Sequence, residues 1–218
     1  NNPVVGPEYE HFLGTEFSLG YRVRRIRELI EADTDGITIE DVQRMHGDVY
    51  DQAAAETVAY LRGVDLSAAA AAPAAEEEKP RSARQREKEQ KKAAEELEAM
   101  EAARVRLLAW DFRMQRDSAE AVLYSCFWVK LLEETLRDQF PESLWPPDEG
   151  GRLQSTIYTL LQDPANPWWD DLGTAEVRES RDDILARAFV KGYRDAVKRA
   201  GDKMDKWRWG KLHTVEFR

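Results

Sequence analysis

Apolar residues recur at helical spacing near the start of the chain. They predict a helix over residues 21–32, with its apolar positions at Val23, Ile26, Leu29 and Ile30. The Asp-Thr-Asp-Gly run at 33–36 ends this helix. Thr38 then stands at an N-cap position, with Asp41 three residues later as an acidic variant of the capping box. We therefore predict a second helix to about Arg62, with buried positions that include Ile39, Val42, Met45, Val49, Ala53 and Tyr60.

The pattern changes abruptly in the next segment. Residues 65–80 are rich in Ala, Glu and Pro and have little to bury, which predicts a flexible linker. Residues 82–106 are rich in Ala, Glu, Lys and Arg, and apolar positions become frequent only toward their end. We expect an exposed helical arm that leads into a buried helix. A solvated helix face explains its charges best, and a partner-binding arm is the alternative.

The most apolar part of the chain lies in its second half. Residues 119–140 are apolar nearly all round, which predicts a helix at the centre of the core. Prolines at 141, 146 and 147 break the chain, a short helix is expected at 153–162, and a turn rich in Pro and Trp follows at 164–169. A capped last helix is predicted from Thr174 or Ser180 to Ala200. The ends at 1–20 and 207–217 are expected to be extended. Because the rest of the chain is predicted to be helical, the fold class is mainly α.

Composition excludes several classes of protein. A net charge of −10 argues against a nucleic-acid partner, and the basic residues at 81–92 are interleaved with Glu87 and Glu89. The most apolar run, 121–132, is too short to span a membrane and contains Lys130. The single cysteine, Cys126, rules out an internal disulfide and is expected to be a small core residue rather than a nucleophile or metal ligand.

Several motifs, taken in order, resemble the middle of the large subunit of penicillin acylases. The resemblance covers nearly the whole chain except residues 65–100, which look like an inserted arm. It rests on Asn-Asn-Pro-Val-Val at 1–5, Gly-Tyr-Arg-Val-Arg-Arg-Ile at 20–26, Leu-Ala-Trp-Asp at 108–111, Asp-Ser-Ala-Glu-Ala at 117–121 and Trp-Arg-Trp-Gly-Lys-Leu-His at 207–213. His213 ends the last motif, and we expect it to have a structural role because nothing pairs it with a nucleophile.

The resemblance implies an N-terminal-nucleophile hydrolase with an αββα sandwich, of which this chain would supply a mostly helical portion. Such enzymes cleave linear amides through an acyl-enzyme, using an N-terminal Ser, Thr or Cys that would lie outside this chain. Asn1 matches the family's oxyanion-hole Asn, and Arg22 matches an Arg near the catalytic centre. Arg25 shares a helical face with Arg22, so residue type alone does not separate the two.

The change of composition at 65–80 divides the chain. The parts are 1–64, with the Asn loop and first helical pair, the 65–80 linker, and 81–218, with the arm, the core helices and the Trp-rich ending. We expect one structural domain with an inserted arm. The partners that the resemblance implies are an N-acyl small-molecule substrate and the rest of the precursor, namely the small subunit and the part of the large subunit that carries the nucleophile.

No cofactor is expected in this segment. The family binds calcium partly through an acidic residue after the Asn pair, and calcium is therefore expected only of the intact enzyme. The loop here offers Glu8, Glu10 and Glu16 without a clear equivalent. Asp33-x-Asp35-Gly36 begins like a calcium loop, but Val42 occupies the position of the bidentate Glu.

Three interpretations of function follow. In the first, the intact protein hydrolyses an N-acyl amide such as a penicillin, a cephalosporin side chain or an acyl-homoserine lactone, and this segment alone is inert. Its compartment is not fixed by the sequence, although the resemblance implies a periplasmic or extracellular enzyme. The others are a stand-alone helical interaction module and an inactive acylase homologue. If the family's sheet normally packs on this segment, the isolated chain should expose apolar surface and self-associate.

Overall fold

The computed structural model describes residues 5, 6, 8–13, 19–71, 82–145 and 151–215. All regular structure in these residues is helical, and a single antiparallel β-bridge joins Tyr50 to Arg113. The mainly α prediction is confirmed. The helices are α1 (Tyr21–Glu31), α2 (Ile39–His46), α3 (Gln52–Val58), α4 (Ser67–Ala71), α5 (Ala83–Leu108), α6 (Ala119–Leu136), α7 (Gly151–Gln162), α8 (Arg181–Ala200) and α9 (Trp209–Leu212).

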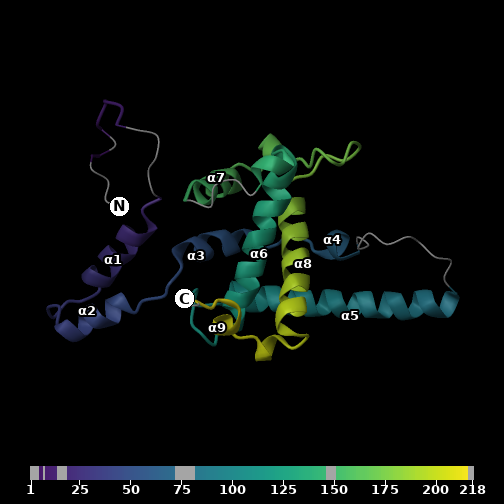
Figure 1. Cartoon of the computed structure of the whole chain (residues 1–218), viewed down its shortest axis with the longest axis horizontal. Helices are drawn as coiled ribbons and strands as arrows, with labels where there is room; N and C mark the ends of the chain where they lie inside the picture. Colours follow the sequence, from purple (N-terminus) through teal and green to yellow (C-terminus); the bar gives the residue numbers. More distant parts are fainter. Residues whose placement is uncertain (1–4, 7, 14–18, 72–81, 146–150, 216–218) are drawn as a thin grey trace.

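The centre of the molecule is an antiparallel pair formed by α6 and α8 (Figure 1). Their backbones approach closely because Gly192 has no side chain: a Cβ placed there would lie 2.6 Å from the Cα atom of Phe127. The rings of Phe127 and Phe189, both fully buried, lie 6.1 Å apart between the helices. The apolar stretch predicted as the core centre therefore has that position, as expected for a helix covered on several sides.

Helix α5 has an exposed half and a buried half. Ser82 caps its N-terminus in a capping box with Gln85, and residues 83–95 are exposed. Met100, Ala103 and Leu107 are buried in the core, while the first half projects away from α8 (Figure 1). The prediction of an arm that leads into a buried helix is confirmed.

The helix predicted over residues 38–62 is wrong in its length. The capping box of Thr38 and Asp41 is present, but α2 ends at His46, with Gly47 as its C-cap. Asp51 caps a new helix by accepting a hydrogen bond from the backbone N–H of Ala54. Between the two helices the chain turns to pair with another segment: the N–H groups of Asp51 and Met114 donate to the carbonyls of Phe112 (2.8 Å) and Val49 (2.9 Å).

The expected burial along this segment is also partly wrong. Ala53 is buried, and Met45 and Tyr60 are partly buried, but Ile39, Val42 and Val49 are exposed. Neither α1 nor α2 contains a buried residue. The N-terminal helices therefore lie outside the core of the described chain.

Two segments expected to lack helix contain short ones. The linker prediction fails for residues 65–71, because Leu66 is fully buried and the α4 residues Ala69 and Ala70 pack against the core. Residues 72–80 lie outside the described part of the chain. The predicted extended ending is interrupted by α9. The backbone N–H groups of Trp209 and Gly210 donate to the carbonyls of Ser118 (3.2 Å) and Arg116 (2.8 Å), which lie in the segment before α6 and not in a strand.

The segment before α8 is fixed by a buried carboxylate. Glu179 pairs with Arg187 and accepts hydrogen bonds from the Thr174 hydroxyl (2.9 Å) and the Asp171 N–H (3.1 Å). Ser180 then caps α8, with Asp183 completing a capping box. Of the two predicted starts for the last helix, Ser180 is therefore the observed one. The short helix predicted at 153–162 corresponds to α7.

Candidate functional site

Helix α1 is attached to the rest of the molecule by its polar face. The hydroxyl of Tyr21 donates a hydrogen bond to Glu56 of α3 (2.7 Å), and Arg24 forms an ion pair with the same carboxylate (3.1 Å). The side-chain amide of Gln52 donates to Glu28 (2.8 Å). Burial, and then the neighbouring Glu56 carboxylate, raise the pKa of Tyr21, so this phenol stays protonated as a donor.

Arg25 belongs to a second polar cluster, centred on Asp48. The Asp48 carboxylate is 8% exposed and accepts hydrogen bonds from Arg25 (2.7 Å) and from Arg113 (2.8 Å). The Arg25 guanidinium also lies over the ring of Tyr50, 4.5 Å from its centroid. This cluster joins α1 to the segment between α2 and α3 and to residues 112–114. Arg25 is therefore a structural residue in this chain.

The cluster makes stability depend on pH. Hydrogen bonding to Arg25 is the main reason why the pKa of Asp48 is lowered from its usual value. The folded state therefore binds a proton at Asp48 less tightly than the unfolded state does. Its contribution is fully present above the unfolded pKa of about 3.9 and is lost as the pH falls through the lowered folded value.

We predict that Asp48→Asn destabilises the chain by about 2 kcal/mol at pH 7, since two guanidinium groups lose their charged acceptor. The free energy of unfolding should also fall less steeply below pH 4 than in the unmodified chain. Urea unfolding at several pH values measures both effects. Asp117→Asn is the control, because Asp117 is 83% exposed and lies 3.7 Å from Arg208, and it should change stability by less than about 0.5 kcal/mol. Equal losses in the two variants would contradict the role of Asp48.

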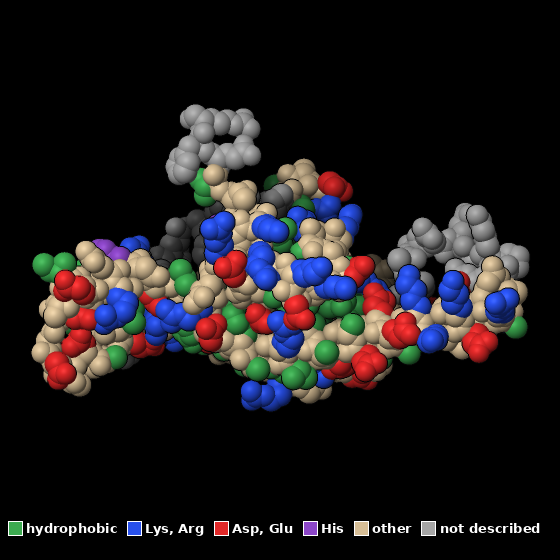
Figure 2. Space-filling model, turned by 90° about the horizontal axis from the view of Figure 1, so that it is seen from below, with side chains coloured by type: hydrophobic (Ala, Val, Ile, Leu, Met, Phe, Trp, Pro, Cys, Tyr) green, Lys and Arg blue, Asp and Glu red, His purple; other side chains and the backbone are tan. Residues whose placement is uncertain are grey.

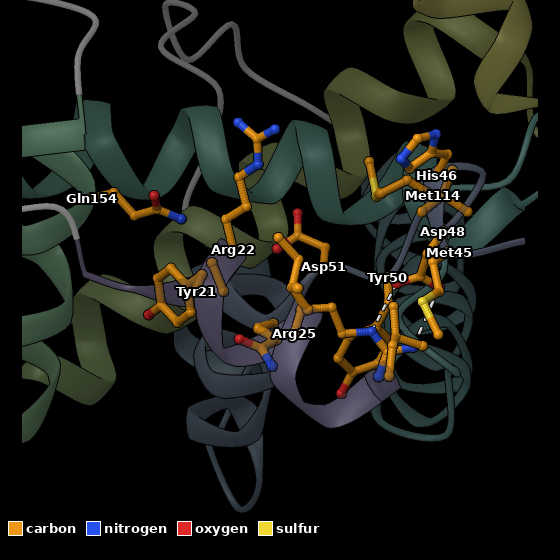
Figure 3. Close-up of a pocket in the computed structure, with 15 residues that line it drawn as sticks. Tyr21, Arg22, Arg25, Met45, His46, Asp48, Tyr50, Asp51, Met114 and Gln154 are labelled. Atoms are coloured by element: carbon orange, nitrogen blue, oxygen red, sulfur yellow. Dashed lines mark hydrogen bonds and ion pairs between the residues drawn. The ribbon is translucent and has the colours of Figure 1, made fainter. Parts of the chain in front are cut away.

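A cleft of about 790 Å³ lies between α1, α2 and the segment that connects α2 to α3. Its apolar lining is provided by Ile26, Leu29, Met45, Val49 and Met114. Arg22 lines the same cleft from the first turn of α1, and Gln154 of α7 faces it (Figure 3). The Arg22 side chain extends away from Arg25 and Asp48 (Figure 3).

Arg22 differs from Arg24 and Arg25 in its charge partners. It is exposed and, like Arg27, forms no ion pair with a carboxylate of the described ranges, whereas Arg24 and Arg25 are held by Glu56 and Asp48. The cleft distinguishes Arg22 from Arg27, because Arg22 lines it and Arg27 does not. A guanidinium without an ion pair can offer its N–H donors to a ligand or to another part of the protein. The structure thus separates the two arginines that helical spacing places on one face.

Asn1 lies outside the described residues, so its position relative to Arg22 is not defined. Among the acidic loop residues, Glu8 and Glu10 are exposed, and Glu16 falls outside the described residues as well. Within the described part of the chain, no three His, Cys, Asp or Glu side chains converge as metal ligands. We therefore assign no metal-binding residue. Nor is any helix there long and apolar enough to cross a bilayer.

The other candidate residues have structural positions. Cys126 is buried in α6, and burial raises the pKa of its thiol to about 11, so it is not a thiolate near neutral pH. The ring of His213 stacks on Trp209 with centroids 4.9 Å apart. Trp169 and Trp207 are fully buried and donate their indole N–H groups to the backbone carbonyls of Asp163 and Gly201. These two tryptophans are therefore core residues.

Comparison with known proteins identifies the family. The sequence profile described as penicillin amidase matches residues 1–218, which is the whole chain. The chain belongs to the penicillin amidase family. The resemblance inferred from the ordered motifs is thus confirmed. The αββα sandwich that the resemblance implied stays a prediction, since the regular structure of the described residues is helical.

Several similar proteins carry the name acyl-homoserine lactone acylase QuiP. The protein from Pseudomonas aeruginosa is 32% identical over 123 residues, covering 51% of this chain and 14% of that protein. Its counterpart in Pseudomonas fluorescens strain Pf-5 is 32% identical over 133 residues, with coverages of 56% and 16%. The Pseudomonas putida protein is 34% identical over 118 residues, with coverages of 51% and 14%. The chain thus spans only a small part of the length of the relatives it matches.

Sequence reasoning missed the Asp48 cluster. Asp48 directly follows Gly47, and a Gly-Asp pair inside a predicted helix is a signal for a break. That break would have placed Asp48 in a loop, where it could meet the arginines of α1. Its second partner, Arg113, is 65 residues away, and no local pattern indicates that contact.

Proposed function

We propose that this chain is a segment of an amidohydrolase that cleaves linear N-acyl amides through an acyl-enzyme. Membership of the penicillin amidase family and the acylase names of the relatives support the reaction class. The small share of each relative that the chain covers supports the view that other catalytic groups lie elsewhere in a longer polypeptide. The segment alone is then inert, because it lacks the nucleophile.

The proposed reaction requires a nucleophile, a base and an oxyanion site. An N-terminal Ser, Thr or Cys outside this chain attacks the amide carbonyl and transfers its proton to its own α-amino group. Asn1 is proposed to donate a side-chain N–H to the negatively charged oxygen of the tetrahedral intermediate. Cleavage of the C–N bond releases the amine, which takes up that proton, and water then hydrolyses the acyl-enzyme to the carboxylic acid.

The position of Arg22 in the cleft, without an ion pair to any carboxylate of the described residues, is the observation that best supports the site. The fold commits Arg24 and Arg25 to carboxylates but presents Arg22 to an open cleft. We propose that Arg22 is a positioning residue that holds Asn1 or the α-amino group in place once the rest of the enzyme is assembled. A planar cation with several fixed donors suits this task. An arginine that served only as a surface charge would have no need to line a cleft.

The proposed substrates are N-acyl small molecules, with acyl-homoserine lactones as the first to test because the relatives carry that name. The decisive experiment expresses the complete polypeptide that contains this chain and determines the N-termini of its fragments by mass spectrometry. A fragment that begins with Ser, Thr or Cys before Asn1, together with release of fatty acid from an N-acyl-homoserine lactone or of phenylacetate from penicillin G, would support the proposal. A single unprocessed and inactive chain would overturn it and favour an inactive homologue or an interaction module.

Substitution of Arg22 tests its role separately. In the mature enzyme, Arg22→Ala is expected to lower kcat by about 100-fold, since loss of a positioning contact misplaces the reacting groups. Arg27→Ala is the matched control, because Arg27 is another exposed arginine of α1 but does not line the cleft, and it should leave kcat unchanged. Arg22→Lys keeps the charge and should recover only part of the activity. Equal effects of the Arg22 and Arg27 substitutions would contradict a specific role for Arg22.

A further inference from the structure

Helix α1 leaves half of its apolar stripe uncovered: Val23 and Leu29 are partly buried, whereas Ile26 and Ile30 are exposed. A surface helix normally turns its apolar stripe toward the core and its charges toward water. Here Tyr21, Arg24 and Arg25 connect α1 to α3 and to Asp48 by hydrogen bonds and ion pairs. The isoleucines lie on the outside, with Ile26 47% exposed and Ile30 45% exposed.

Helix α2 and the turn before it continue this exposure. Ile39 is 74% exposed, and Ile37, Val42 and Val49 are each at least 40% exposed. More than half of the large hydrophobic side chains exposed among the described residues lie before residue 51. Figure 2 shows hydrophobic side chains at the surface of the end formed by α1 and α2. We call Ile26, Ile30, Ile37, Ile39, Val42 and Val49 the outer apolar face.

Arg22 lies at one end of this face. On a helix, residues at i, i+4 and i+8 share one side, which places Arg22, Ile26 and Ile30 in a single row. Arg22, Ile26 and Val49 also line the same cleft. Whatever surface covers the isoleucines therefore also reaches Arg22, so the outer apolar face is continuous with the proposed site.

Two observations indicate which surface covers this face. The chain matches only 14–16% of the length of its relatives, so most of a protein of that kind lies outside it. A second copy is the less favourable partner, because each copy carries a net charge of −10 and self-association must overcome the repulsion between the two. Exposed apolar side chains that gather on two consecutive helices indicate a surface that another protein part covers.

We propose that the outer apolar face is the docking surface for the nucleophile-bearing remainder of the same polypeptide. The inference rests on the proposed function, since it assumes that this chain is one segment of a larger enzyme. The polar face of α1 holds the helix on the α3 side, and the isoleucines bind the missing part. Docking then brings Arg22 to the nucleophile without changing its contacts within this chain.

The test compares cysteine labelling in the isolated chain and in the complete polypeptide. Ile26→Cys and Ile39→Cys probe the outer apolar face. Val129→Cys and Leu172→Cys are matched controls on other surfaces, because Val129 is 48% exposed, close to the 47% of Ile26, and Leu172 is 67% exposed against 74% for Ile39. A maleimide reagent labels each variant, and labelling is read from tryptic peptides, so cysteines elsewhere do not interfere.

All four cysteines should react at similar rates in the isolated chain. In the complete polypeptide, the two on the outer apolar face should react about ten-fold or more slowly, because each thiol reacts only when the covered surface opens. The two controls should be unchanged. Unchanged labelling of Ile26→Cys and Ile39→Cys would overturn the proposal. Protection that increases with the concentration of the isolated chain, and does not increase further in the complete polypeptide, would also overturn it, since a second copy would then be the partner.

A measurement of activity on the complete polypeptide distinguishes a failure of this inference from a failure of the proposed function. Amide hydrolysis is measured on the complete polypeptide without cysteine substitutions. Protection of the outer apolar face without hydrolysis would leave the interface standing and remove the enzymatic proposal. Hydrolysis without protection would support the enzymatic proposal and remove the proposed interface.

Discussion

Asn1→Ala in the mature, complete enzyme is expected to lower kcat for amide hydrolysis by about 100- to 1,000-fold. The proposed role of Asn1 is to donate a hydrogen bond to an oxygen that carries full negative charge only in the tetrahedral intermediate. An interaction that forms mainly in the transition state affects kcat and leaves KM nearly unchanged. Steady-state kinetics with an N-acyl-homoserine lactone or penicillin G would measure the two constants separately.

The neighbouring residue provides the control for this prediction. Asn2→Ala removes the same chemical group one position further on and should retain most of the activity. Mass spectrometry must show that each variant is processed to the same N-terminus, so that lost catalysis is not confused with lost maturation. A raised KM with an unchanged kcat would assign Asn1 to substrate binding and contradict the oxyanion role.

Long, strongly patterned helices could be predicted from the sequence alone. The stretch that forms α6 is apolar on nearly every side, and only a position at the centre of several packed elements buries such a helix. The start of α8 follows from Ser180 and Asp183, whose side chains satisfy backbone N–H groups that every helix N-terminus leaves free. Both features depend on residues that are close in sequence, so the local sequence pattern is sufficient to predict them.

The break between α2 and α3 depends on more than local sequence. Residues 38–62 have a nearly continuous helical period, but Gly47 ends the first helix and Asp51 caps the next. The pairing of Val49 with Met114 uses backbone groups that a continuous helix would have occupied. That partner segment lies more than sixty residues away, so its competition with helix formation is not visible in the local period.

In the candidate site, too, some features follow from the local sequence and others depend on residues that are distant in the chain. Sequence spacing places Arg22 and Arg25 on one side of α1, but only the position of Asp48 shows which of them is neutralised within this chain. Likewise, the period of α1 identifies an apolar stripe, and the described structure shows that Ile26 and Ile30 of this stripe are exposed while polar side chains connect the helix to α3. A hydrophobic pattern specifies which side chains share a face, while the identity of the surface that covers them is a property of the assembled protein.

Among the glycines that the structure describes, Gly192 is the one where an added methyl group should most disturb the fold. A Cβ atom there would lie 2.6 Å from the Cα atom and 2.8 Å from the backbone nitrogen of Phe127, well inside van der Waals contact. Backbone atoms cannot move aside as a flexible side chain can, so α6 and α8 would have to separate along their packed interface. We predict that Gly192→Ala destabilises the chain by about 3 kcal/mol.

The sign of this effect distinguishes packing from helix propensity. In an exposed helix interior, Ala is about 1 kcal/mol more favourable than Gly, so propensity alone predicts that Gly192→Ala stabilises the chain. Gly47→Ala is the control, because the nearest atoms to a Cβ there are carbonyl oxygens at 3.7 Å, an ordinary contact. It should change the free energy of unfolding by less than about 0.5 kcal/mol. Urea unfolding followed by circular dichroism compares the two variants. A stabilised Gly192→Ala chain would show that α6 and α8 do not approach closely enough to exclude a methyl group, and the central helix pair would then have to be packed differently.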